Sequence, residues 1–325
     1  MKLLVTSTFV TPFIADDLAI LRKYHAVEHL LVRGSAALPR IVRGVRRNDA
    51  VYAWFASTYA AVAVASARSL GRPAVIAIGG ADVAGMEEIG YGIWNSPWKS
   101  RLVGYALRNA DRILAVDPFL KDEAARRARY DGGNIRVLPT GFDADFWTPG
   151  GERGDVVLTV AACDSEPRLK VKGIDLVLET ARLLPGVRFV LVGIDARFIE
   201  GLRLTAPENI DIRGRVSRDE LRALYRAARV YFQPSRVEGL PNSVCEAMLC
   251  GCIPVCTDVG GMKTPVAGSG YLVPWGDARG LAAAIGQARS LAPEAGLRAR
   301  DSIASRFTPD RRERGLLEEF GMLAP

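Results

Sequence analysis

The chain has 325 residues, of which 49% are hydrophobic, and it carries 43 lysines and arginines against 36 aspartates and glutamates, a formal net charge of +7. This length suits about two domains of ordinary size, each with a sizeable core. No apolar run approaches the roughly 20 residues that span a membrane, and the N-terminus lacks the features of a secretion signal, so we expect a cytosolic protein.

Strand-like and helix-like segments alternate along the chain, which favours parallel sheets built from βα units. The strands predicted in the first part are residues 3–6, 28–32, 49–55, 74–78, 112–116 and 135–138. Thr11 and Pro12 form a predicted helix start after the first of them. A polar, glycine-rich stretch at 150–154 then indicates a linker.

The same alternation continues beyond the linker. The strands predicted there are residues 156–161, 187–192, 210–213, 230–233, 253–257 and 270–273. The helices predicted between them are residues 173–184, 217–228, 243–249 and 280–291. A last segment, 308–320, is charged and helical in pattern. The sequence therefore predicts an α/β protein with two doubly wound parallel sheets.

Two carboxylates, Glu238 and Glu246, flank a Gly-Leu-Pro-Asn turn between a predicted strand and a predicted helix. In a parallel sheet this turn lies at the carboxyl end of the strands, where open α/β sheets bind ligands. The N–H groups of a helix start favour a phosphate. A simpler interpretation is that Asn242 or Ser243 caps the helix, that Glu246 completes a capping box, and that Glu238 is a solvated charge.

This segment resembles the donor-site signature of retaining GT-B glycosyltransferases, specifically glycosyltransferase family 4, the "glycosyl transferases group 1". Five further matches carry the resemblance: Lys172–Asp175, Leu138–Asp143 with Phe146–Pro149, Phe189–Gly193, Gly260–Gly261 and Gly270–Val273. The resemblance is close over residues 105–320 and weak before them. It implies two Rossmann-like domains facing across a cleft, an acceptor domain of 1–149 joined by a helix at 308–325, and a donor domain of 150–307.

The resemblance implies that the donor is a nucleotide-diphosphate sugar. Glu246 would then bind the ribose hydroxyls, and Glu238 would lie against the donor sugar. The backbone N–H groups of Gly239, Leu240 and Asn242 would meet sugar hydroxyls or the distal phosphate. The implied outcome is transfer of a hexosyl group with retention, in which the donor phosphate itself accepts the proton of the acceptor.

Positive groups are needed where the leaving diphosphate gains charge. Lys172, just before a helix start, is the first candidate, and Arg168 is the second. The family's usual Gly-Arg-Leu is replaced here by a stretch that begins Ala161-Ala162-Cys163. Either Arg168 or Lys170 reaches the phosphates from a longer loop, or the arginine contact is missing.

The first domain is expected to hold the acceptor. Asp82 follows the fourth strand, where many relatives have a histidine, and is a candidate for orienting a hydroxyl, although a turn alone would also explain it. The N–H groups after Thr11 are candidates for facing the diphosphate. Three aromatic residues could stack on a sugar, rest at a lipid interface or pack in the core: Tyr91, Trp94 and Trp98.

Neither a metal nor another cofactor is expected. The resemblance implies metal-independent transfer, and no Asp-x-Asp pair lies in a suitable loop. Four of the five cysteines, Cys245, Cys250, Cys252 and Cys256, are close in sequence, but they lack a C-x2-C pair and fall in predicted buried elements, so reduced apolar packing is favoured over zinc binding. The two histidines, His25 and His29, are interpreted as surface or packing residues.

Five arginines lie within fifteen positions: Arg33, Arg40, Arg43, Arg46 and Arg47. This stripe suits an anionic partner, such as a lipid-linked phosphate acceptor or the inner face of a membrane, although a solvated helix face would look the same. No nucleic-acid-binding motif is present. Two alternatives to a transferase stay open, a nucleotide-sugar epimerase and an inactive GT-B scaffold subunit. A nicotinamide dehydrogenase is disfavoured, because no G-x-G-x-x-G follows the first strand.

Overall fold

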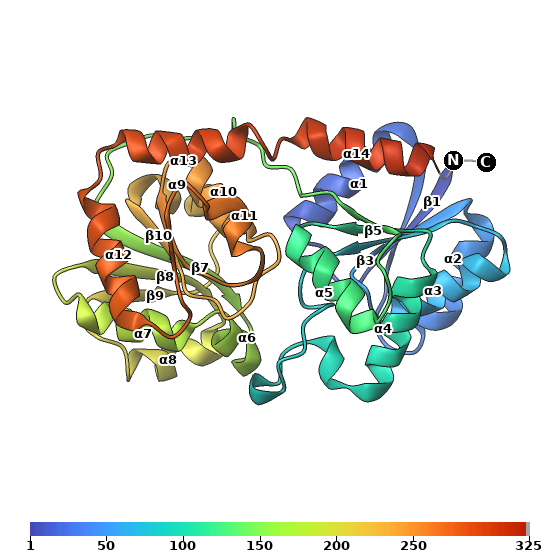
Figure 1. Ribbon diagram of the computed structural model, residues 1–325, viewed down its shortest axis with the longest axis horizontal. Helices are drawn as coiled ribbons and strands as arrows, with labels where there is room; N and C mark the ends of the chain where they lie inside the picture. The colour runs from blue at the N-terminus through green and yellow to red at the C-terminus, as the bar shows by residue number, and fades with distance from the viewer. Residues whose placement is uncertain (323–325) are drawn as a thin grey trace. The chain divides into compact units, whose positions relative to one another are not determined.

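The computed structural model describes residues 1–322, which form two compact units. The first unit comprises Met1–Gly141 and the segment from Pro309 onward, and the second comprises Phe142–Thr308. Each unit has one six-stranded, all-parallel sheet covered by helices, as Figure 1 shows. The predicted α/β class with two parallel sheets is confirmed.

The sheet of the first unit has the order β2-β1-β3-β4-β5-β6. Its strands are β1 (Lys2–Ser7), β2 (Ala26–Leu31), β3 (Ala50–Trp54), β4 (Ala74–Ile78), β5 (Arg112–Ala115) and β6 (Ile135–Val137). Every residue of the central strands β3 and β4 is buried, because parallel strands are covered on both faces. The helices are α1 (Pro12–Tyr24), α2 (Ala37–Arg47), α3 (Thr58–Ser69), α4 (Pro97–Asn109), α5 (Pro118–Ala128) and α14 (Pro309–Gly321).

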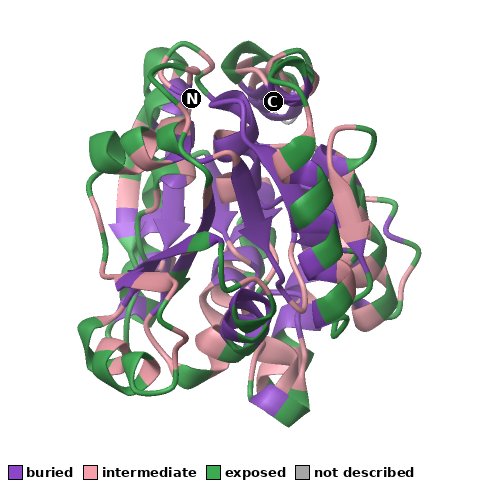
Figure 2. Ribbon diagram, turned by 90° about the vertical axis from the view of Figure 1, so that its left-hand side faces the viewer, coloured by how far each residue is buried: buried purple, intermediate pink, exposed green. Residues whose placement is uncertain are grey.

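The sheet of the second unit has the order β12-β11-β10-β7-β8-β9. Its strands are β7 (Val156–Cys163), β8 (Arg188–Ile194), β9 (Ile210–Arg213), β10 (Val230–Gln233), β11 (Ile253–Thr257) and β12 (Tyr271–Val273). Its helices are α6 (Glu166–Val171), α7 (Ile174–Leu183), α8 (Ala196–Arg203), α9 (Arg218–Ala227), α10 (Asn242–Leu249), α11 (Lys263–Val266), α12 (Ala278–Ser290) and α13 (Glu294–Ala304). Figure 2 shows buried strands between helices that turn an exposed side outward.

Strand order places β10 and β7 next to each other at the centre of the second sheet. The chain order reverses at this point, since β8 and β9 follow on one side of β7 and β11 and β12 follow on the other side of β10. Ligands of open α/β sheets bind at such a reversal, outside the carboxyl ends of the strands. The segments after β7 and β10 are therefore the two that a candidate site in this unit should use.

The glycine-rich stretch predicted as a linker lies within the second unit, since the chain enters that unit at Phe142. Arg153, at the end of this stretch, donates hydrogen bonds to the carbonyls of Ala228 and Cys250. The stretch is thereby fixed to the ends of α9 and α10. Among residues 1–322, every helix is too short or too polar to cross a lipid bilayer.

The C-terminal helix α14 packs in the first unit through a buried ion pair. Arg312 donates to both carboxylate oxygens of Asp17 on α1, at 2.9 and 2.6 Å, and to the carbonyl of Leu138. The hydroxyl of Tyr52 and the indole N–H of Trp54, both on β3, also donate to Asp17. Two helices and a central strand are thus joined by one buried polar network.

Candidate functional site

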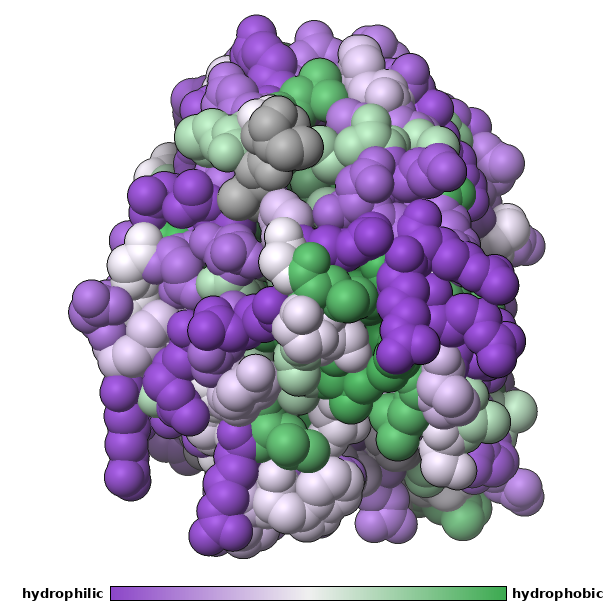
Figure 3. Space-filling view, turned by 90° about the vertical axis from the view of Figure 1, so that its right-hand side faces the viewer, coloured by the Kyte–Doolittle hydropathy of each residue, from purple (hydrophilic) through white to green (hydrophobic). Residues whose placement is uncertain are grey.

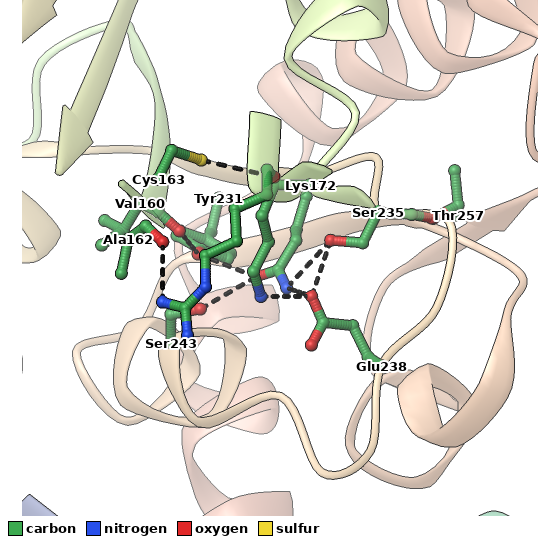
Figure 4. Close-up of polar contacts among 11 residues, drawn as sticks. Val160, Ala162, Cys163, Lys172, Tyr231, Ser235, Glu238, Ser243 and Thr257 are labelled. Atoms are coloured by element: carbon green, nitrogen blue, oxygen red, sulfur yellow. Dashed lines mark hydrogen bonds and ion pairs between the residues drawn. The ribbon is translucent and has the colours of Figure 1, made fainter. Parts of the chain in front are cut away.

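Glu238 lies in the turn that follows β10, and three donors converge on one of its oxygens. Oε1 accepts hydrogen bonds from Lys172 Nζ at 2.6 Å, Gln233 Nε2 at 2.7 Å and Ser235 Oγ at 2.7 Å (Figure 4). Gln233 is the last residue of β10, and Ser235 follows it by two positions. The simpler interpretation, in which Glu238 is a freely solvated loop charge, is therefore wrong.

Lys172 reaches Glu238 because the chain bends sharply at the next residue. Gly173, the N-cap of α7, has φ +66°, a backbone conformation that residues with a Cβ rarely adopt. A Cβ added at Gly173 would lie 2.0 Å from the carbonyl oxygen of Pro234. Glycine therefore allows the α6–α7 corner to rest directly on the segment after β10, which brings Lys172 to Glu238.

Glu246 lies on α10 and accepts a hydrogen bond from the hydroxyl of Tyr225, at 3.2 Å from its Oε2. The capping box predicted at the start of α10 is wrong. The N-cap is Pro241, without a side-chain cap bond, and the Ser243 hydroxyl donates instead to Gln233 Oε1 at 2.9 Å. Burial, reinforced by the charge of Glu246, raises the pKa of Tyr225 well above its ordinary value, so this phenol stays a donor.

The turn between the two glutamates is tightly held. Gly239 and Leu240 are buried, and the carbonyl of Glu238 accepts from the N–H of Gly261 at 3.0 Å. Asn242 is the first residue of α10. The turn therefore lies at the start of α10, at the carboxyl end of β10, which is where the sequence placed these candidate donor-binding residues.

Arg168 and Lys170 lie on the short helix α6 rather than on a loop. Pro167 in the first turn suits a helix start, which explains the difference. Arg168 is half-exposed and approaches Asp164, with 3.4 Å between Nε and Oδ1. Lys170 is exposed. Neither contacts Glu238, so of the three predicted cations only Lys172 is joined to it within the described residues.

Asp82 belongs to the first unit. It is buried, and its carboxylate accepts from the backbone N–H groups of Ala56 at 3.1 Å, Gly79 at 3.2 Å and Gly80 at 2.7 Å. These bonds join the turn after β3 to the turn after β4. Burial raises the pKa of Asp82 to about 6, although the backbone hydrogen bonds oppose that rise.

The first unit also contains Thr11 and the three aromatic residues that were candidates for contacting a sugar or a lipid. Thr11 is the N-cap of α1 but makes no side-chain cap bond. The indole N–H of Trp94 donates to the carbonyl of Asp82 at 2.9 Å, whereas Trp98 is exposed beside Lys99. Tyr91 forms a bridge with Met86.

The histidines have separate surroundings. His29 lies 2.9 Å from the hydroxyl of Ser7, and His25 packs against the ring of Phe320. Burial lowers the pKa of both. These contacts fit the packing role expected of them.

The cysteines are buried free thiols. Burial raises the pKa of Cys252 to about 11 and that of Cys250 to about 12, so both stay protonated at neutral pH. The thiol of Cys252 donates to the carbonyl of Tyr225 at 3.0 Å. In the described part of the chain, no three histidine, cysteine or acidic side chains are grouped to hold a metal ion.

Sequence reasoning did not find Gln233, Ser235 or Tyr225 as residues of the site, and it considered Ser243 only as a helix cap. Gln233 was noticed only as the end of a strand, yet a glutamine inside a buried apolar strand needs polar partners. That signal was available in the run Val-Tyr-Phe-Gln. Tyr225 gave no signal, because its contact with Glu246 joins residues 21 positions apart.

Two family profiles match the chain, one for each part. The profile described as "Glycosyltransferase Family 4" matches residues 8–146, and that described as "Glycosyl transferases group 1" matches residues 154–290. A D-inositol 3-phosphate glycosyltransferase of Mycobacteroides abscessus is 30% identical over 201 residues, 53% of this chain and 44% of that protein. One of the subunits of the phosphatidylinositol N-acetylglucosaminyltransferase of Arabidopsis thaliana is 23% identical, over 60% of this chain and 45% of that protein.

The matched segments span about half the length of these relatives. Solved structures resemble the whole chain. Anabaena HepE in complex with UDP and glucose aligns with a TM-score of 0.80 at 18% identity, over 99% of this chain and all of that one. The sucrose-phosphate synthase of Thermosynechococcus elongatus aligns with a TM-score of 0.81 at 16% identity, over 99% of this chain and 98% of that one.

Proposed function

Since the chain belongs to the GT-B glycosyltransferases of group 1 and family 4, we propose that it transfers a hexosyl group from a nucleotide-diphosphate sugar to a hydroxyl of an acceptor. The observation that carries this proposal is the junction of Lys172 and Glu238 at the carboxyl end of β10, beside the helix that bears Glu246. This contact supports the proposal, because a cation that suits a diphosphate and two carboxylates that suit hydroxyl groups belong to one unit.

Each group has a task in this reaction. Lys172 and the N–H groups at the start of α10 would stabilise the negative charge that the diphosphate gains as the bond to the anomeric carbon breaks. Glu246 would accept hydrogen bonds from the ribose hydroxyls, and Glu238 from the sugar. The acceptor oxygen forms the new bond on the same face of the sugar, and its proton passes to the leaving phosphate oxygen, so the configuration is retained. This scheme uses neither a metal ion nor a protein base.

A uridine diphosphate sugar is the donor to test first, because the structurally similar HepE binds UDP and UDP-glucose. We propose that the first unit holds the acceptor, a glycan, a lipid-linked hydroxyl or a small polyol. Relatives named for inositol phosphate and phosphatidylinositol support an acceptor that carries phosphate. The exposed arginines of α2 would suit such a group.

The proposal is tested with a panel of UDP-, GDP- and ADP-sugars. We expect one nucleotide class to raise the melting temperature selectively, since a ligand stabilises only the folded state that binds it. Glu246→Gln should weaken binding of that donor about tenfold or more, through loss of a hydrogen bond to a charged group. Glu179→Gln, on the exposed side of α7, is the matched control and should leave binding unchanged.

The outcomes separate this function from its alternatives. If no nucleotide sugar stabilises the protein, the transferase assignment fails. If a donor binds without hydrolysis or transfer to any acceptor, the chain is a binding or scaffold subunit. If the product is an isomerised nucleotide sugar, it is an epimerase.

We also propose a cytoplasmic protein that contacts an anionic membrane at its inner face. In the first unit, α3 contacts both α2 and α4. Figure 3 faces the side on which α2 lies and shows hydrophilic side chains around a hydrophobic area. Trp98 and Leu102 on α4 are exposed large apolar residues. The exposed arginines of α2 are Arg40, Arg43, Arg46 and Arg47.

Vesicle co-sedimentation tests this contact. Binding should increase with phosphatidylglycerol content and decrease with salt, because the arginines attract anionic lipids. Replacing Arg40, Arg43 and Arg47 together by serine should reduce it. Binding that ignores lipid charge and salt would contradict the contact.

A further inference from the structure

We propose that Gln233 is a positioning residue for the donor sugar: it anchors Oε1 of Glu238, so that Oε2 is presented to a sugar hydroxyl whether or not Lys172 stays bound to the carboxylate. This inference rests on the proposed function and adds a role for a residue that acts through Glu238. Its basis is the hydrogen-bond network around the end of β10 (Figure 4).

The orientation of the Gln233 amide follows from its neighbours. The hydroxyls of Tyr231 and Ser243 each lie 2.9 Å from Gln233 Oε1, and both can donate. Its Nε2 lies 2.7 Å from the carboxylate of Glu238. If the oxygen and nitrogen of the amide were exchanged, the oxygen would face the Glu238 carboxylate, and two hydrogen-bond acceptors would be in contact. The amide therefore donates to Glu238.

Burial makes this anchor rigid. Gln233 is 2% exposed and Ser235 is fully buried. The carbonyl of Ser235 accepts from the Thr257 hydroxyl at 2.5 Å, which fixes this segment to the end of β11. A buried polar side chain with all its groups bonded has one stable arrangement, since breaking any bond leaves an unpaired polar group.

The three donors to Oε1 differ in mobility. Gln233 and Ser235 are buried and neutral, whereas Lys172 is a flexible cation whose side chain is about a quarter exposed. A diphosphate attracts this ammonium strongly. The lysine side chain is flexible and its three N–H donors rotate, so it can turn to the diphosphate and form hydrogen bonds there. Glu238 would then keep two hydrogen bonds and its orientation.

The other oxygen of the carboxylate is left for a ligand. Among residues 1–322, Glu238 Oε2 has no hydrogen-bond partner, and Figure 4 shows it pointing away from the three donors. The Glu238 side chain is 12% exposed, so one side of it meets solvent. A carboxylate oxygen in this position accepts a hydroxyl hydrogen bond without moving.

The test is Gln233→Met, which keeps the length of the side chain and removes its donor. The expected result is a fall of about 10- to 100-fold in kcat/KM for the nucleotide sugar, as for a lost hydrogen bond to a charged group, with the Kd of the free nucleoside diphosphate changed less than threefold. A merely structural role would weaken nucleotide and nucleotide sugar alike. Equal losses for both ligands, or no loss, would overturn the proposal.

A double-mutant cycle with Glu238→Ala tests whether Gln233 acts through Glu238. The double variant should be no worse than Glu238→Ala alone, because the carboxylate that Gln233 positions is then absent. Additive losses would contradict the inference. Should Gln233→Met fail to fold, Ser235→Ala removes the second neutral donor and should shift kcat/KM in the same direction, with the same sparing of nucleotide binding.

These results are separable from failure of the proposed function. If the unaltered protein binds and transfers no sugar, the transferase assignment is wrong. If it does both and the Gln233 variant matches it, only the positioning role is wrong.

Discussion

At the scale of single residues, Asp82 illustrates how burial can shift the pKa of a carboxylate whose hydrogen bonds are structural. Its oxygens accept from the N–H groups of Ala56, Gly79 and Gly80, so its evident task is to hold two turns of the first unit together. The pKa of about 6 reflects burial more than these bonds. Perturbed carboxylates occur both at active sites and in structural networks, so its role in orienting an acceptor hydroxyl remains a proposal.

Asp82 predicts a pH dependence of stability. Its folded-state pKa of about 6 lies above the ordinary 3.8, so the folded state binds this proton more tightly than the unfolded state. The stability it contributes is present below pH 3.8 and is lost as the pH rises through 6. Between pH 4 and 7 the free energy of unfolding should fall by about 2–3 kcal/mol relative to Asp82→Asn. Urea unfolding of both proteins checks this, and an opposite slope would mean that the N–H bonds outweigh burial.

At the scale of elements, two Ser-x-x-Glu patterns had different outcomes. Ser217 and Glu220 form a capping box at the start of α9. Ser243 and Glu246 have the same spacing but do not, because the serine donates to Gln233 and the glutamate accepts from Tyr225. The local pattern is the same, and tertiary partners decide which bonds form.

Gly173 predicts a sharp effect at a helix start. Gly173→Ala would combine an unfavourable positive φ with a Cβ 2.0 Å from the Pro234 carbonyl. The cost should exceed the 1–2 kcal/mol of the backbone conformation alone, about 2 kcal/mol or more, and Lys172 should move away from Glu238. Urea unfolding and the transfer rate measure both effects. Gly186→Ala, where a Cβ has nothing within 4 Å, is the matched control and should be nearly neutral.

At the scale of the whole molecule, the α/β class, the two parallel sheets and the family were predicted from the sequence and are confirmed. Four strands, β4, β9, β10 and β11, have the predicted bounds, because each is a short run containing valine or isoleucine with turn residues close to its ends. Helices α6, α8, α11 and α13 of the second unit were not predicted, and the six residues of α6 and four of α11 carry little periodicity. The junction of Lys172 with Glu238 could not be predicted, because it depends on how two chain segments 66 positions apart approach each other.

The ion pair of Asp17 and Arg312 predicts that a mutation in it destabilises only the first unit. Both side chains are almost fully buried, and removing one partner leaves an uncompensated buried charge. Arg312→Met should therefore destabilise the first unit by about 3–5 kcal/mol and leave the second unit unaffected. Calorimetry should show one transition shifted to lower temperature. Arg314→Met, at an exposed position of the same helix, is the control, and equal effects of the two would contradict the prediction.

The ion pair of Asp17 and Arg312 also affects when the two units can fold during translation. Asp17 is translated 295 residues before Arg312. Until then the nascent first unit holds a carboxylate without its cation and a sheet without α14. The second unit needs residues up to Thr308, so the two units are completed at almost the same point of translation. The first unit should therefore become resistant to protease no earlier than the second, although its translation begins first, which departs from the usual vectorial order.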